Sequence, residues 1–258
     1  MMQRGFTLVE LAIVLVIVGT LTGGIMIGQS LVRSAGVRGA LAEAQQYGNA
    51  VIAFQEKYNA LPGDMPDATD YWGVLHATPA TCRTTVSSTS ATCNGNGDGS
   101  IADQTGSNEP FRAWQHLSNA GLIEGVYEGT TGSVGAVDYD LGRNAPASKL
   151  SPAGFGLSDF NNSGGTVASW PGMKLGNALW LGTEEDNSYL DGVALTPSEA
   201  SMMDTKIDDG MPRLGAVLGG YNSTCTDTST ATTTTAQYKT DSNAKACFML
   251  FGFQQAVP

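Results

Sequence analysis

The sequence predicts an α+β fold: a long N-terminal helix with a membrane-spanning first half, packed on an antiparallel β-sheet head with disulfide-closed loops. Three observations predict it. An almost uncharged apolar run at the start continues into apolar residues at helical spacing. Short apolar stretches farther along are separated by glycine-rich turns, as strands are. Four cysteines form one close pair in each half of the chain.

Composition limits the class of protein. The chain has 258 residues, enough for one large domain or two small ones. Charged residues make up 14%, against roughly 25% in an average soluble domain, which favours an exported surface protein over a cytosolic enzyme. The net charge is −11 and there is no basic run, which argues against a nucleic-acid partner because such partners need clustered Lys and Arg.

The first segment, from Phe6 to Ile27, carries a single charge, at Glu10. About 20 apolar residues of helix span a bilayer, so this segment can cross a membrane. A cleaved secretory signal would have a shorter apolar core and a small-residue cleavage site. A plain membrane anchor leaves Glu10 unexplained, because a carboxylate at the membrane centre costs ~2.5–3.5 kcal/mol.

The residues around this acid carry a family resemblance. Arg4-Gly5 followed by Phe6-Thr7-Leu8-Val9-Glu10 resembles the type III signal of type IV pilins and of the related type II secretion pseudopilins. The resemblance implies that a prepilin peptidase cuts after Gly5 and that Phe6 becomes the N-methylated first residue. It also implies a precursor in the inner membrane that then joins identical or related subunits in an extracellular, helical, cell-surface filament.

In that interpretation Glu10 is an assembly residue. Cleavage creates a positive amine on Phe6, which can lie beside Glu10 of a neighbouring subunit. Two buried charges then neutralise each other, and only in the right axial register. The alternative is a carboxylate that snorkels to the membrane interface.

One position departs from the family pattern. Many members carry proline at about the twenty-second mature residue, which loosens the helix during assembly, whereas this chain has Ile27. Gly23, Gly24 and Gly28 lie around it, and each weakens a helix by up to ~1 kcal/mol. These glycines serve either the same loosening or close helix packing.

The expected organisation has four parts. Residues 1–5 form the leader, 6–30 the transmembrane and filament-core helix, 31–60 its continuation packed on the head, and 61–258 the globular extracellular head. The helix should end by Leu61-Pro62-Gly63. A head of this size favours a minor or specialised subunit over a major pilin.

Two further helices are predicted in the head. The first is capped by Ser107 or Asn108, has Pro110 in its first turn and ends at Gly121. The second begins with a T-x-x-E capping box at Thr196–Glu199. Residues 77–92 are predicted to be a surface loop. Five short stretches are predicted to be strands: Ile123–Tyr127, Phe155–Phe160, Thr166–Trp170, Ala178–Leu181 and Leu214–Leu218, with Cys247–Phe251 as a sixth.

The simplest cysteine pairing joins Cys82 to Cys93 and Cys225 to Cys247, one of three connectivities, with four free thiols as the alternative. Each bond would close a short loop and contribute about 3 kcal/mol. Disulfides persist in oxidising compartments, so this pairing favours the periplasm or the cell exterior. The second loop resembles the C-terminal disulfide loop of many pilins.

The stretch CNGNGDGSIAD matches the first half of a calcium loop. Oxygen ligands at alternate positions can converge on one Ca²⁺ ion, and the candidates are Asn94, Asn96, Asp98 and Ser100. The twelfth place is Thr105 instead of glutamate, so a plain Asn/Gly turn is the favoured interpretation. If an ion binds, Asp103 or Glu109 would complete its shell. Asp64 and Asp67 could also be ligands, but they are likewise interpreted in preference as turn-forming residues.

No catalytic motif is present, so the chain is predicted not to be an enzyme. It lacks G-x-S-x-G, H-E-x-x-H, C-x-x-C and P-loop patterns, and His76 and His116 are its only histidines. The adjacent Asp208 and Asp209 are read as a helix-ending turn rather than an acid–base pair. The tryptophans could line a carbohydrate site, although core packing is favoured: Trp72, Trp114, Trp170 and Trp180. A calcium-binding, adhesive head at a filament tip is a rival that is compatible with the filament.

Overall fold

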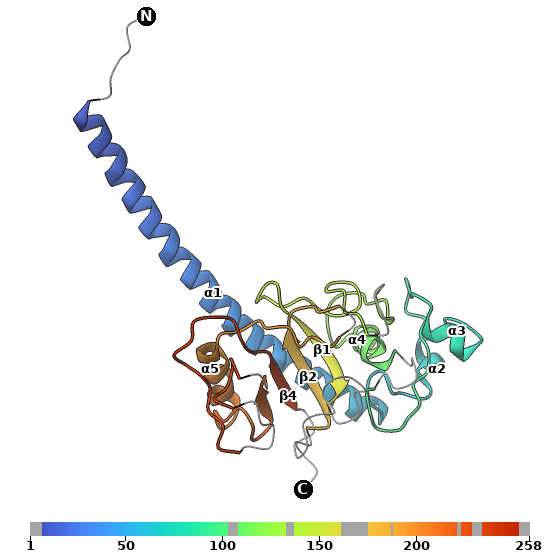
Figure 1. The fold of residues 1–258 in the computed structure, drawn as a ribbon. Coiled ribbons are helices and arrows are strands. Elements are labelled where there is room, and N and C mark those ends of the chain that lie inside the picture. The colour runs from blue at the N-terminus through green and yellow to red at the C-terminus, as the bar shows by residue number, and fades with distance from the viewer. Residues whose placement is uncertain are drawn as a thin grey trace, which may run out of the picture.

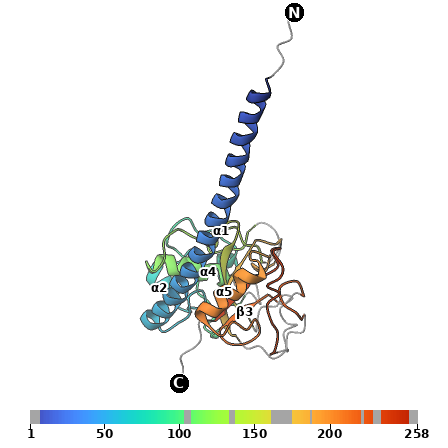
Figure 2. The same cartoon turned by 90° about the vertical axis from the view of Figure 1, so that its left-hand side faces the viewer.

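The computed structural model describes residues 7–102, 108–132, 137–160, 175–186, 188–220, 223–228 and 234–252. A single long helix projects from a compact head, and its second half runs along that head (Figure 1). The view turned by 90° shows the same arrangement, with the first half of the helix standing clear of every other element (Figure 2).

The long helix α1 spans Leu8–Tyr58 without interruption. It ends where Asn59 adopts a left-handed conformation and donates its N–H to the Gln55 carbonyl, just before the predicted Leu61-Pro62-Gly63 stop. Only its second half is buried, on a stripe at helical spacing that faces the head. The largest members of this stripe are Val37, Val51 and Phe54.

Gly63 shapes the turn that follows α1. It has a φ of +85°, and its N–H donates to Nδ1 of the buried His116. A Cβ atom at this position would lie 2.3 Å from the Glu109 carbonyl oxygen. Only glycine therefore fits between α1 and the helix that begins at Glu109.

We expect Gly63→Ala to lower the free energy of unfolding by about 3 kcal/mol or more, from backbone strain plus the steric overlap. Gly48→Ala is the matched control, because nothing lies within 4 Å of a Cβ at this helical position. That variant should be neutral or stabilising by up to ~1 kcal/mol. Thermal or urea unfolding of both variants checks the difference, and equal stabilities would contradict this account of the turn.

The head is built on one four-stranded antiparallel sheet. Its strands are β1 (Gly154–Asp159), β2 (Asn177–Gly182), β3 (Val217–Gly219) and β4 (Met249–Gly252), in the order β1-β2-β4-β3. Side chains alternate between the two faces. Phe155 contacts Tyr47 of α1, whereas Trp180, opposite Gly156, stacks on Tyr189 and Phe248 on the other face.

Two helices of 11 residues each pack on the sheet of the head. Helix α4 (Glu109–Asn119) packs against β1 and α1, and its Trp114 meets Tyr47 edge to face. Helix α5 (Pro197–Ile207) packs against β3. The predicted capping box at Thr196–Glu199 is present, with both reciprocal hydrogen bonds.

The α+β prediction is confirmed, and three local predictions were wrong. Residues 123–125 form bends and 126–127 are irregular, instead of a strand, because Gly125 has a φ of +106°. The predicted strand at 214–218 begins only at Val217, since Gly215 has a φ of +74°. The segment 77–92 contains a short helix, α3 (Pro79–Arg83), which follows another, α2 (Ala68–Trp72). The predicted strand at 166–170 lies outside the described residues.

Disulfide bonds join Cys82 to Cys93 and Cys225 to Cys247. The first pair is tied to α4, because the buried Arg112 guanidinium donates to the carbonyls of Cys82 and Thr85. The second is tied to the segment before α5, because Cys247 exchanges backbone hydrogen bonds with Leu195. The first disulfide-closed loop is therefore fastened to α4, and the second to the segment just before α5.

Candidate functional site

The first half of α1 is an apolar surface without a covering. Each of its large apolar side chains from Leu8 to Val32 is at least 51% exposed. An 18-residue window has a mean hydropathy of 2.4 and none of it is buried, so this helix is long and apolar enough to cross a membrane. Such a surface needs either lipid or other protein around it.

Glu10 lies in the first turn of this helix, where its carboxylate folds back on Thr7. The Thr7 N–H and hydroxyl both donate to Glu10 Oε2, each at 2.8 Å. The Glu10 N–H donates in turn to the Thr7 hydroxyl at 3.3 Å. These bonds form a capping box, so Glu10 also satisfies the open end of its own helix.

This capping role was not predicted, although the sequence carries its signal. Thr7 and Glu10 have the same T-x-x-E spacing as Thr196 and Glu199. The cap holds the carboxylate at the start of α1, where the helix dipole also favours a negative charge. Gly5 and Phe6, the predicted processing residues, lie outside the described residues.

The predicted calcium loop wraps around Asp64. Its carboxylate accepts backbone N–H groups from Gly97 at 2.6 Å, Asp98 at 3.1 Å and Gly99 at 2.9 Å. Burial raises the pKa of Asp64 in spite of these three donors. Asp64 was predicted to be a turn-forming residue, and the fold places its carboxylate against the backbone of the loop at Gly97–Gly99.

The four candidate ligands mostly bond within or beside the loop. The side-chain oxygen of Asn94 accepts the Thr69 N–H, and that of Asn96 accepts the Asp98 N–H. Asp98 accepts the Ser100 N–H, and the Ser100 hydroxyl donates to Asp159. The bonds of the Asn96 and Asp98 side chains to the backbone two residues on are typical of Asx turns, the interpretation that the sequence favoured.

Glu109 approaches the same loop from the start of α4. Its carboxylate accepts the N–H of Asn96 at 3.3 Å and of Ala102 at 3.2 Å. Burial raises the pKa of Glu109 to about 7, and the Asp64 and Asp98 carboxylates add to the rise. The carboxyl groups of Asp64, Asp98 and Glu109 therefore interact electrostatically at this loop, and Ca²⁺ binding there stays a prediction.

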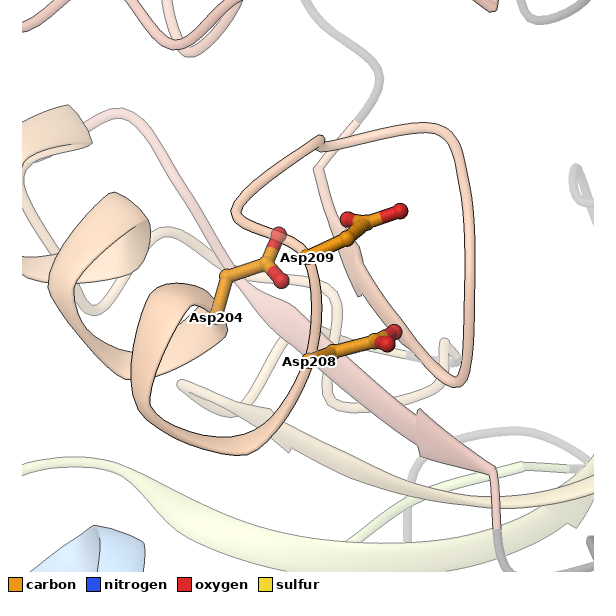
Figure 3. Close-up of side chains that lie close together, drawn as sticks. All are labelled: Asp204, Asp208 and Asp209. Carbon is orange, nitrogen blue, oxygen red and sulfur yellow. The ribbon is translucent and has the colours of Figure 1, made fainter.

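A second acidic group lies at the end of α5. Ligand atoms of Asp204, Asp208 and Asp209 lie within 4.8 Å of one another (Figure 3). Each carboxylate accepts backbone N–H groups: Asp204 from Gly210, Asp208 from two residues at the start of β3, and Asp209 from Met211. These bonds make the helix-ending turn that the sequence predicted.

The histidine and tryptophan positions are mainly structural. His116 is fully buried, and burial lowers its pKa to about 3, so it stays neutral while it contacts Gly63 and Thr92. Trp114 and Trp180 lie in the core. Trp72 is half-buried beside Tyr58, and Trp170 lies outside the described residues.

The comparisons with known proteins bear on the start of the chain. Residues 1–26 match the family model described as the prokaryotic N-terminal methylation motif. The chain therefore begins with a type IV pilin-like leader signal, as its residues predicted. Comparisons with curated proteins and with solved structures found no match. The motif supports a type IV pilin-like or pseudopilin subunit and covers none of the head.

Proposed function

We propose that the chain is a structural subunit of a type IV pilus-like extracellular filament. A prepilin peptidase cuts the inner-membrane precursor after Gly5, and Phe6 becomes the methylated first residue. The mature chain then packs with identical or related subunits through α1. One observation carries the proposal: the methylation motif leads directly into a helix whose apolar side chains are exposed over its whole first half.

In the proposed function, the apolar surface of α1 is covered both in the membrane and in the filament. In the membrane, lipid covers the exposed half of α1, which is long enough to span the bilayer. In a filament, the same side chains would pack against other copies of α1. The head stays outside, where its two disulfides are stable in an oxidising environment.

Gly5→Ala tests the first step. Intact-mass measurement should show the wild-type chain shortened by its first five residues and methylated, and the variant at full precursor length. Electron microscopy of surface filaments, with antibody against the head, should then label wild-type cells and leave Gly5→Ala cells unlabelled. A wild-type chain that keeps residues 1–5 would contradict the proposal.

A subunit of a type II secretion pseudopilus and a tip subunit are the alternatives. The head, from about residue 61 onward, is large, and its loops 82–93 and 225–247 are fastened at both ends. Antibody label along the whole filament length supports a main structural subunit, and label confined to filament ends supports a tip subunit. Loss of protein secretion without loss of surface filaments supports the pseudopilin alternative.

A further inference from the structure

Arg33 stands where α1 leaves the head. Every residue of α1 before it is exposed, and the first buried residues, Gly36 and Val37, follow within one turn. Its guanidinium forms a fork on Glu199, with Nε to Oε1 at 2.8 Å and Nη2 to Oε2 at 2.7 Å. Nη2 also donates to the Ala194 carbonyl at 2.7 Å.

The Arg33–Glu199 contact is suited to hold α1 in one orientation on the head. The fork sets the orientation as well as the distance of the two groups, because both N–H bonds must be satisfied in one plane. The two side chains are 27% and 18% exposed, so water screens the pair only partly. Burial alone would raise the pKa of Glu199, and the hydrogen bonds from Arg33 and Thr196, together with the Arg33 charge, lower this pKa below its usual value.

The partner of Arg33 is itself held rigidly. Glu199 Oε2 accepts the Thr196 N–H in the capping box of α5, so it is fixed from both sides. The N–H groups of Ala194 and Leu195 donate to the Cys247 carbonyl, and Cys247 is bonded to Cys225. Arg33 therefore joins α1 to the part of the head that the second disulfide stabilises.

A small tilt of α1 at the Arg33–Glu199 contact would move the far end of the helix by a large distance. The 25 residues from 8 to 32 extend about 37 Å beyond Arg33 at 1.5 Å per residue. A tilt of about 10° at Arg33 would move the start of α1 by about 6 Å, more than the reach of an ion pair at Glu10. The direction in which α1 leaves the head must therefore be set closely.

We propose that Arg33 is a positioning residue for assembly: its fork on Glu199 fixes the direction in which the apolar half of α1 leaves the head. This inference rests on the proposed filament function. It assigns to the Arg33–Glu199 pair the task of bringing Glu10 into register with a neighbouring subunit.

The direction of α1 can be measured without a filament. Spin labels on Val18→Cys and Lys206→Cys, both exposed, report the distance between the free half of α1 and α5 in the full chain in detergent micelles. The native cysteines are bonded and do not take label. Arg33→Gln should broaden this distance distribution about twofold or more, as loss of both fork bonds allows tilting. Glu199→Gln, which keeps one acceptor oxygen and loses one fork bond, should broaden it less.

Arg143→Gln is the matched control. Arg143 likewise contacts both carboxylate oxygens of a glutamate, Glu128, and it also pairs with Asp140; neither partner belongs to α1. Its removal should leave the distance distribution unchanged. An unchanged distribution in Arg33→Gln as well would overturn the proposal, because the other helix–head contacts would then suffice to hold α1.

Competition between wild-type and variant chains for entry into filaments tests whether the Arg33–Glu199 contact matters for assembly. When wild-type and variant chains are co-expressed, Arg33→Gln should be cut normally yet enter filaments about tenfold less often, while Arg143→Gln enters equally. Arg33→Lys, which keeps the charge and loses the fork, should recover part of the difference.

The outcomes separate the two proposals. Equal entry of Arg33→Gln and wild type would overturn the positioning role. Entry that falls only in proportion to melting temperature, as in a core variant such as Val51→Ala, would also overturn it and leave a stability role. If wild type forms no filament, the proposed function fails, and the spin-label distances still decide whether Arg33 fixes α1.

Discussion

A chain with Glu10→Ala is expected to be cut after Gly5 like the wild type, yet to enter filaments at about a tenth of the wild-type level or less. In the proposed filament, Glu10 faces the new amine of a neighbour's Phe6. Removal of the carboxylate leaves that amine unpaired among apolar side chains, a larger cost than the loss of the pair itself. Intact mass and quantitative immunoblots of sheared filaments measure the two steps.

The capping box at Thr7 offers a second explanation for such a defect, and one variant separates the two. Thr7→Ala removes the hydroxyl that accepts the Glu10 N–H, and it keeps the carboxylate charge. If the charge governs assembly, Thr7→Ala should assemble nearly normally. If the cap governs it, Thr7→Ala should fail as Glu10→Ala does, because an N-cap lost to alanine costs about 1 kcal/mol.

Glu10→Gln completes the comparison. It keeps an oxygen that can accept the Thr7 N–H, and it loses the charge. We expect it to assemble as poorly as Glu10→Ala. Normal filaments from Glu10→Gln would remove the charge-pairing argument altogether, whatever the outcome for Thr7→Ala.

Local signals predicted much of the fold. The apolar run that becomes α1, the T-x-x-E cap of α5, and the proline and glycine that bound α4 each act through neighbours within a few residues. The wrong strand at 123–127 shows the limit of such signals. Apolar residues suggested extension there, and the positive φ at Gly125 turned the chain instead.

Contacts between distant residues could not be predicted in the same way. Arg33 and Glu199 are 166 positions apart, and nothing local at either residue indicates the other. The bonds from Gly97 and Gly99 to Asp64, and from Gly63 to His116, depend likewise on how the fold brings two segments together. The leader signal could be predicted from the sequence because its residues lie within one short segment, and the assembly role of Glu10 stays a prediction.

We also expect the head to lose stability as pH rises from about 4 to about 7 in the absence of calcium. Burial raises the pKa of Glu109 to about 7 and that of Asp204 to about 7. The folded state then holds protons that the unfolded chain has already released, so each rise in pH favours unfolding across this window. For Glu109 the full change is about 3 kcal/mol, since one pKa unit corresponds to ~1.4 kcal/mol.

Glu109→Gln should remove the Glu109 part of this slope. At pH 8 in excess chelator, the variant should be more stable than wild type, because no charge is buried at this position. At pH 5 it should be less stable by about 1 kcal/mol, because one of the two accepted N–H bonds is lost. Urea unfolding of both proteins at the two pH values measures whether the order of their stabilities reverses. The same difference in unfolding free energy at pH 5 and pH 8 would contradict a raised pKa at Glu109.

Calcium reverses this expectation if the loop at Asn94–Ser100 binds it. A cation among Asp64, Asp98 and Glu109 would favour the ionised carboxylates. Added Ca²⁺ would then raise the melting temperature at pH 8 much more than at pH 5, and Glu109→Gln would reduce the rise. No shift with Ca²⁺ at pH 8, and none on chelation, would leave the loop as a turn closed by its own Asx hydrogen bonds, with Glu109 neutral beneath it at lower pH.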